Sequence, residues 1–367
     1  MRSWKKTVSL LAGASALLGT GAAHAATQQF KGMTLTVLGV NADLNAIYMR
    51  TFGVKFEKET GAKLVLVPGS PGDNLSKALL AKGRTPNFQV IGLEDLQLAQ
   101  AIQADAVQKI KYSRLPASKG LAPGAVPAAE YGPSFDFFRF GTCINVAKYK
   151  EHKITIPTSI EGWFDPAIRG HNILPTPANF WWPTGMQALA ESQGISFNNP
   201  KPLFEKLRSM KPSSLYTASG DAQTALQTGA AWLAPTSDGR CYAMKMAGQP
   251  VDFVPLNLKI GGKTYTYVFG VDTWQIPIGV KGKELELAYR FINASLSSSS
   301  QVAVAKKFGF EPTMEKGLKM AMELPQAKRA GVYGPGFSFK NMYAPNPLKL
   351  LPYLNQWVQE WNSMFTQ

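Results

Sequence analysis

The chain has few of the residues on which transition-metal and thiol chemistry depend. Its 367 residues include two cysteines, Cys143 and Cys241, and three histidines. Metal sites of this kind are usually built from clustered thiolates and imidazoles, so we expect no bound metal and no cofactor. Both cysteines stand in apolar stretches, FGTCINV and GRCYAM. The sequence is equally compatible with one disulfide and with two buried thiols.

Long apolar runs are missing beyond the N-terminus. Residues 1–25 have the three parts of a cleaved secretory signal peptide: the basic start MRSWKK, the apolar segment TVSLLAGASALLG and the small-residue site AHA. That apolar segment is too short to span a bilayer, and no later run approaches the roughly 20 residues that a membrane helix needs. We therefore expect export and a periplasmic location.

Acidic residues are outnumbered by basic ones, 24 to 39, which gives a net charge of +15. Loss of residues 1–25 removes Arg2, Lys5 and Lys6 and lowers this charge to +12. An excess of basic residues can bind nucleic acid, an anionic membrane surface or anionic ligands. The lysines are scattered rather than gathered in a stripe, and an exported protein does not meet nucleic acid. We interpret the charge as a solvated basic surface.

Catalytic motifs are also absent. The segment IGGKTY resembles the end of a phosphate-binding loop, but Asn257 occupies the position of the first glycine, and the segment reads as a hairpin turn. The sequence contains no G-x-S-x-G, H-E-x-x-H or C-x-x-C motif. We therefore expect a protein that is not an enzyme.

Strand and helix patterns alternate from residue 33. The segments MTLTVLGV, AKLVLVPG and FQVIGL read as strands, with helical patterns over residues 44–61, 73–83 and 94–107. This alternation predicts a parallel sheet covered on both faces. Such sheets bind ligands at the carboxyl ends of their strands, here GVNADLN, PGSPGDN and GLEDLQ. These ends supply candidate ligand-binding residues: Asn41, Asp43, Ser70 and Glu94.

Further candidates lie in the second half of the chain, after a Pro/Gly/Ala-rich loop over residues 113–134. The segment NFWWPTG places Trp181 and Trp182 in a Pro-flanked loop. There the two indole rings could either stack on a ligand or pack in the core. Ser219 stands where a helix begins, so nearby N–H groups could bind ligand oxygens or be capped. The buried strand FGVDTWQIPI is interrupted by Asp272 and Trp274, which share one face of a regular strand.

Taken together, these segments resemble the extracellular solute-binding proteins of ABC importers, in particular the spermidine/putrescine-binding type. The most specific blocks are SIEGWFDPAIRGHNILP and GVDTWQIPIGVKGKELELAYRFINAS. The resemblance implies an α/β fold of two Rossmann-like lobes with a hinge of crossover strands, the type II periplasmic binding protein fold. We divide the chain into lobe 1, residues 26–139 and 273–330, and lobe 2, residues 140–272 and 331–367.

The resemblance also implies a monomer that encloses a small-molecule ligand between its lobes and delivers it to a membrane permease. Polyamine-binding members hold ammonium groups with carboxylates and enclose the methylene chain with aromatic rings. Asp272 falls on one such carboxylate position, and Asp238 lies close to a position where these members carry an aromatic ring. Trp274 belongs either to the cleft wall or to the core. We therefore expect a polyamine-like, amine-bearing solute.

Two alternatives remain open at the level of sequence. The segment TPANFWWP lacks the additional acids that polyamine binders carry there, so an anionic or zwitterionic solute such as an aminophosphonate is one alternative. An enzyme on the same scaffold, with Cys143 or Cys241 as its nucleophile, is the other, although neither has a neighbouring group to lower its pKa. A structural or adhesive role is disfavoured because nothing in the sequence repeats.

Overall fold

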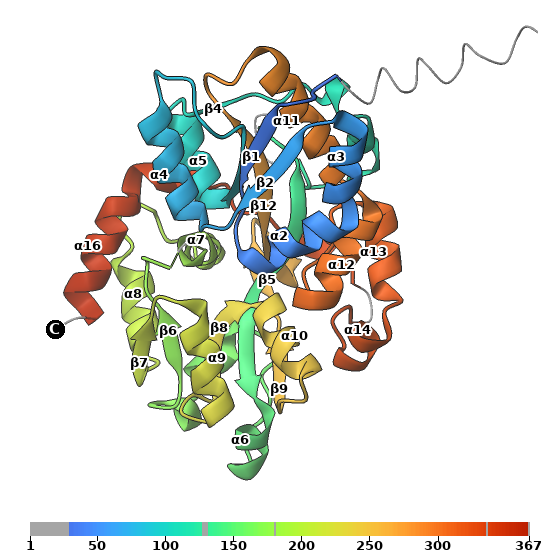
Figure 1. Cartoon of the computed structure of the whole chain (residues 1–367). Helices are drawn as coiled ribbons and strands as arrows, with labels where there is room; N and C mark the ends of the chain where they lie inside the picture. The colour runs from blue at the N-terminus through green and yellow to red at the C-terminus, as the bar shows by residue number, and fades with distance from the viewer. Residues whose placement is uncertain (1–28, 127–130, 180, 335–336, 366–367) are drawn as a thin grey trace, which may run out of the picture.

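Two long strands, β5 (Ser134–Asn145) and β12 (Tyr267–Pro277), run through the centre of the molecule and join two groups of helices and strands (Figure 1). Residues 268–273 of β12 pair antiparallel with residues 134–140 of β5, and both strands are almost entirely buried. This computed structural model describes residues 29–126, 131–179, 181–334 and 337–365. The predicted signal peptide, residues 1–25, lies outside the described residues.

The first group is built on a sheet whose strands β1 (Thr34–Leu38), β2 (Lys63–Val67) and β3 (Val90–Glu94) are parallel, which confirms the three predicted strands. Strand β12 continues this sheet antiparallel to β3, so the sheet is mixed rather than wholly parallel. The helices of this group are α2 (Ala42–Tyr48), α3 (Val54–Thr60), α4 (Pro71–Ala81), α5 (Asp95–Gln103) and α11 (Gly282–Ser295).

Two predicted helices differ in detail from those observed. A π-helical turn, Met49–Gly53, separates α2 from α3, so the pattern over residues 44–61 is not one continuous helix. Helix α4 begins at Pro71 rather than at Asp73, because the Ser70 hydroxyl accepts the N–H of Asp73 at 3.1 Å and caps the helix. A proline fits the first turn of a helix, where its missing N–H would have no intrahelical partner.

The second group surrounds the far end of β5 (Figure 1). Strands β8 (Leu233–Ser237) and β9 (Val251–Val254) pair antiparallel with β5, and β6 (Ile173–Pro175) pairs with β7 (Ser214–Tyr216). Strands β10 (Leu258–Ile260) and β11 (Lys263–Tyr265) form the predicted hairpin. The helices here are α6 (Val146–Glu151), α7 (Trp182–Ser192), α8 (Lys201–Arg208), α9 (Ser219–Thr228), α10 (Asp238–Met246) and α16 (Leu354–Phe365).

The segment after α11 returns the chain from the first group to the second. Helix α12 (Ser298–Phe308) contacts both α2 and α10, and α13 (Glu315–Met322) and α14 (Pro325–Ala330) follow it. The short strands β4 (Val107–Gln108) and β13 (Met342–Tyr343) pair with β12, and α15 (Pro347–Leu350) precedes α16.

Separate hydrophobic cores stabilise the two groups. One core draws on residues between 30 and 135 and between 274 and 304, and another on residues between 138 and 268 and between 327 and 364. Trp357 and Trp361 of α16 are fully buried in the latter, as the apolar stripe of this helix predicts. Ala327 and Ala330 of α14 also pack there, although they fall within residues 273–330, which we assigned to lobe 1.

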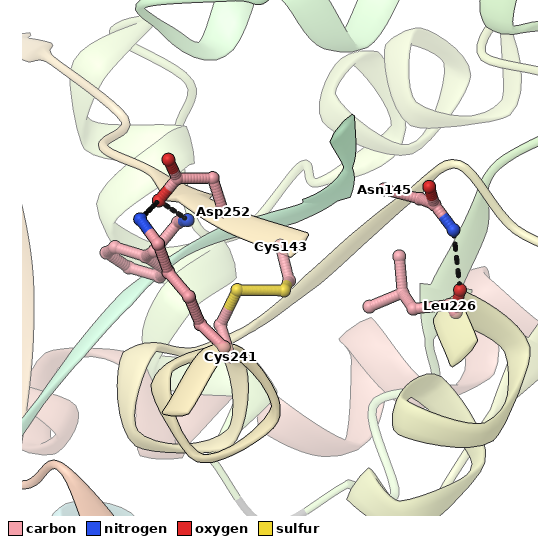
Figure 2. Close-up of a disulfide and its surroundings, with 7 residues drawn as sticks. Cys143, Asn145, Leu226, Cys241 and Asp252 are labelled. Carbon is pink, nitrogen blue, oxygen red and sulfur yellow. Dashed lines mark hydrogen bonds and ion pairs between the residues drawn. A yellow bond between two sulfur atoms is a disulfide. The ribbon is translucent and has the colours of Figure 1, made fainter. Parts of the chain in front are cut away.

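A disulfide between Cys143 and Cys241 joins β5 to α10 (Figure 2). Both residues are fully buried, and they are the only cysteines of the chain. The sequence is compatible with one disulfide or with two buried thiols, and the structure contains the disulfide. It also removes the alternative of a cysteine nucleophile, because both sulfur atoms are bonded to each other.

Candidate ligand-binding site

A cavity of about 220 Å³ lies where the two groups of elements meet. It is located at the carboxyl ends of β3 and β8, which is where α/β sheets bind ligands. Lobe 1 and lobe 2 both contribute to its wall, which consists of Val40, Asn41, Ser70, Pro71, Glu94, Phe138, Trp181, Ser219, Ser237, Arg240, Asp272 and Phe310.

A larger cavity of about 750 Å³ lies on the outer side of lobe 1, between α3 and α11. Several of its charged groups already pair with one another, Lys55 with Glu59 at 3.6 Å and Arg290 with Glu286 at 3.3 Å. Lobe 2 contributes no residue to its wall. We therefore place the candidate site in the smaller cavity between the lobes.

Three carboxyl groups form a row across the sheet at this cavity. Asp272 of β12 lies directly opposite Glu94 of β3 on one side and directly opposite Asp136 of β5 on the other. Residues opposite each other in a ladder project from the same face, so the three side chains are neighbours. Glu94 is 8% exposed, Asp272 5% and Asp136 1%. Glu94 and Asp272 line the cavity, while Asp136 lies behind them.

The ionised state of this acid row, Glu94, Asp272 and Asp136, is unfavourable because the three carboxyl groups are buried side by side. Burial raises the pKa of Asp272 to about 7, and burial together with the charge of Asp272 raises the pKa values of Glu94 and Asp136 well above their usual range. One oxygen each of Glu94 and Asp272 has no hydrogen-bond partner among the described residues, whereas the Asp136 carboxyl is within hydrogen-bonding reach of the Asp272 carboxyl. Asp95, the next residue along the chain from Glu94, accepts the N–H of Val271 at 3.2 Å.

Positive charge and helix N-termini occupy a different part of the wall. Arg240, in the first turn of α10, is the basic residue of the cavity lining and is close enough to Glu94 for their charges to interact. Ser219 is the first residue of α9, and Ser237 precedes α10. Neither helix has a side-chain cap, whereas Asn41 and Ser70 cap α2 and α4. Uncapped N–H groups at helix N-termini favour an anion.

Aromatic side chains complete the wall. Trp181 and Phe138 are each 4% exposed. The Trp181 indole N–H donates to the Ser219 hydroxyl at 3.1 Å and its ring stacks on Phe140, which fixes the indole in place. Phe310 reaches the cavity from the segment after α12. Apolar, flat walls of this kind suit a short hydrocarbon chain.

Six of the ten predicted binding residues line this cavity: Asn41, Ser70, Glu94, Trp181, Ser219 and Asp272. Asp43 lies outside it on the surface of α2, where its carboxylate is 3.3 Å from the ammonium of Lys307. Trp182 is buried in the lobe 2 core, 6.2 Å from the ring of Trp163. The structure therefore places neither of these two residues in the wall of this cavity.

Trp274 is also a core residue. It is fully buried, with its ring stacked on Phe135 at 4.3 Å and set edge-on to Tyr48 at 5.7 Å. It follows Asp272 by two positions on the same ladder with β3, opposite Gly92. The shared face predicted from the sequence therefore exists, but helix α2 covers the indole while the carboxyl reaches the cavity.

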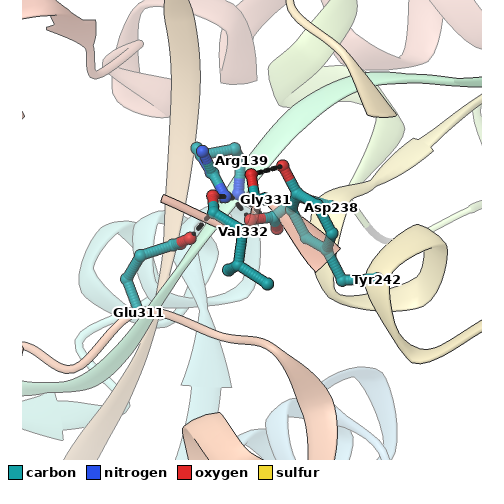
Figure 3. A network of polar contacts seen from close by, with 6 residues as sticks. All are labelled: Arg139, Asp238, Tyr242, Glu311, Gly331 and Val332. Carbon is teal, nitrogen blue, oxygen red and sulfur yellow. Dashed lines mark hydrogen bonds and ion pairs between the residues drawn. The ribbon is translucent and has the colours of Figure 1, made fainter. Parts of the chain in front are cut away.

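Asp238 belongs to a buried ionic network instead of the cavity (Figure 3). Its two oxygens accept from the backbone N–H of Arg139 at 2.9 Å and from the guanidinium Nε at 2.7 Å. The same guanidinium lies 2.8 Å from Glu311 and donates to the Val332 carbonyl at 2.8 Å. All three charged side chains have no exposed surface, so Asp238 cannot reach a ligand without breaking this network.

Sequence reasoning missed several cavity residues. The segment TSDGR, which contains Arg240, reads as a surface turn as readily as a binding loop, and the strand FDFFRF contains Phe138 together with Asp136, which lies behind the cavity wall. An acid inside an otherwise apolar strand was the available signal for Asp136, as it was for Asp272. Phe310 and Ser237 carry no local signal, since only the folded chain brings them to the cavity. Among the described residues, no His/Cys/Asp/Glu cluster is arranged to hold a metal ion.

The fold is the predicted two-lobed α/β architecture, and the candidate cavity lies at the junction of its lobes. The chain belongs to the family of bacterial extracellular solute-binding proteins, whose family model matches residues 52–324. No curated protein matches the sequence. In the described part of the chain, we find no helix with the length and apolar character needed to cross a membrane.

Solved structures of transport proteins share this fold. An ABC transporter structure from Clostridium perfringens is 23% identical, covers 90% of this chain and 99% of its own, and has a TM-score of 0.72. The spermidine/putrescine-binding protein PotD from Streptococcus pneumoniae is 13% identical, with coverages of 89% and 100% and a TM-score of 0.65. A GABA receptor is 18% identical, with coverages of 90% and 97% and a TM-score of 0.69. At these identities the likeness shows the fold alone.

Proposed function

We propose that this protein is the substrate-binding component of an ABC importer and captures a small amine-bearing solute in the cavity between its lobes. The observation that carries this proposal is the row of buried carboxyl groups, Glu94, Asp272 and Asp136, two of which line the cavity with unpaired oxygens. A solute with an ammonium group would supply the missing hydrogen-bond donors and the counter-charge.

Without a ligand, the row of buried carboxyl groups is energetically unfavourable when it is ionised. An unpaired buried carboxylate is unfavourable, and three of them side by side repel one another, so the free protein retains protons there. An ammonium group restores the ionised state by pairing with two carboxylates at once. A purely anionic solute would instead offer no hydrogen-bond donor to the unpaired oxygens and would oppose the ionisation of Glu94 and Asp272, which makes this alternative unfavourable. Phe138, Trp181 and Phe310 would enclose the methylene groups next to the amine.

Ligand contacts from both lobes would favour the closed state of the hinge formed by β5 and β12, and the closed form would be delivered to the membrane permease. The family description and the disulfide support a location outside the cytoplasm, because structural disulfides persist in oxidising compartments. Two of the structures named above, PotD and the GABA receptor, are named for amine-bearing compounds.

A thermal-unfolding screen tests this proposal. We expect 1,4-diaminobutane, butylamine or 4-aminobutyrate to raise the unfolding temperature, whereas 1-butanol and butyrate, which lack the amine, should not. A solute at about 100 times its dissociation constant adds about 2.7 kcal/mol to the free energy of unfolding. Stabilisation by butyrate but by none of the three amines would contradict the proposal.

A further inference from the structure

We propose that the cavity selects solutes that carry an anionic group as well as the amine, and that Arg240 determines this selectivity by binding the anion. This inference rests on the proposed function and deepens it. The positive charge of the Arg240 guanidinium would not be paired by the ammonium group of a bound amine. Arg240 forms no ion pair within the described residues, although it lines the same cavity as Glu94 and Asp272.

The position of Arg240 is fixed by its neighbours in α10. Asp238, two residues earlier, is held by the Arg139 fork (Figure 3), and Cys241, the next residue, is bonded to Cys143 of β5 (Figure 2). Gly239 lies between them against the Phe310 ring, where a Cβ atom would come within 2.2 Å of a ring carbon. The first turn of α10 is thus attached to β5 on both sides of Arg240, which fixes the backbone from which its exposed side chain extends.

The surroundings of Arg240 add to its preference for an anion. Helices α9 and α10 begin at this part of the wall without a side-chain cap, and their N-terminal N–H groups carry partial positive charge. The unpartnered oxygens of Glu94 and Asp272 lie on the β3 and β12 side. One pole of the cavity is therefore negative and the other positive. A diamine would put its second ammonium group near Arg240, whereas a zwitterion matches both poles.

The size of the cavity limits the solute. The volume of about 220 Å³ lies below the roughly 300–1,000 Å³ of sites that bind drug-sized ligands. A short ω-amino acid or an aminoalkylphosphonate fits this volume, and a long polyamine does not. Guanidinium binds either a carboxylate or a phosphonate through paired N–H donors.

Calorimetric titration of the purified protein with 4-aminobutyrate, 2-aminoethylphosphonate and 1,4-diaminobutane tests the inference. We expect wild type to bind at least one of the two zwitterions ten or more times more tightly than the diamine. Arg240→Gln should weaken zwitterion binding at least tenfold, while Arg240→Lys retains part of the affinity. Arg208→Gln on α8, far from the cavity wall, is the matched control and should change nothing.

Arg240→Glu gives a readout that a misfolded variant cannot imitate, because it should strengthen binding of 1,4-diaminobutane while abolishing that of the zwitterions. If wild type prefers the diamine and Arg240→Gln leaves every affinity unchanged, the inference is wrong, yet the proposed function stands. If none of the three compounds nor any other amine binds, the proposed function itself fails.

Discussion

At the scale of single residues, Asp272 is the central group of the site. It lies between two other buried acids, and its pKa of about 7 places its ionisation within the physiological range. Three groups face it or lie beside it: Glu94 from β3, Asp136 from β5 and Asp95 from the start of α5. Burial favours the protonated form of Asp272, whereas its hydrogen bond with Asp136 favours the ionised form, and the charge of ionised Asp272 in turn raises the pKa of each of the three neighbours.

This arrangement predicts a dependence of stability on pH. The folded-state pKa of Asp272 lies above its usual value of 3.8, so the folded protein binds more protons than the unfolded chain between pH 4 and 7. The stability of the solute-free protein should fall as the pH rises through this range. Urea unfolding at a series of pH values measures the slope, which should be smaller in Asp272→Asn. An equal slope in both proteins would show that Asp272 is ionised throughout.

Amine affinity should change in the opposite direction. The ammonium group binds the ionised carboxyl, so its binding competes with protonation of Asp272. Below pH 7 the affinity should rise by up to about tenfold per pH unit for one linked proton, and above pH 7 it should level off. Calorimetric titrations at pH 5, 6, 7 and 8 follow this effect. A flat profile would contradict it.

At the scale of elements, the ionic network of Arg139, Asp238 and Glu311 joins β5 to α10 and to the segment after α12. Four aromatic rings surround the guanidinium at 4.7 to 5.6 Å from its carbon. The network is therefore sealed from water. Its role is to hold together the elements that carry the cavity wall.

Removing one partner of this network should lower the free energy of unfolding by several kcal/mol. Asp238→Asn leaves the buried Arg139 charge with Glu311 alone, and breaking a buried pair costs about 3–5 kcal/mol. Asp252→Asn is the control, because its pair with Lys245 is partly exposed and should contribute under about 1 kcal/mol. Urea denaturation compares the two variants. Equal losses of stability would contradict the structural role that we assign to Asp238.

The elements and the site were not equally predictable from the sequence. Apolar periodicity predicts β1, β2 and β3 because it reflects burial within one segment. The acid row depends on the register between β3, β12 and β5, which are far apart in the chain, so Asp136 could not be placed beside Asp272 in advance. The same limit explains why the sequence could not assign Asp238 to the ionic network: its partner Arg139 is 99 residues away.

At the scale of the whole molecule, two crossover strands both join the lobes and carry the charges of the site. Asp136 lies on β5 and Asp272 on β12, so the proposed cation would bind at the hinge itself (Figure 1). Residues from both lobes would then meet around one solute. Closure of the lobes would depend on the charge of that solute as well as on its shape.

The most direct test of this account is the affinity for amines of wild type, Asp272→Asn and Asp43→Asn, measured by calorimetry at pH 8 with 4-aminobutyrate and 1,4-diaminobutane. Both substitutions remove one carboxylate, but Asp43 lies on the surface of α2 outside the cavity between the lobes. We predict that Asp272→Asn weakens binding of the tighter ligand at least tenfold and that Asp43→Asn leaves it unchanged. Unchanged affinity in Asp272→Asn, with the variant folded, would contradict the central claim that the buried acid row binds the solute's cation.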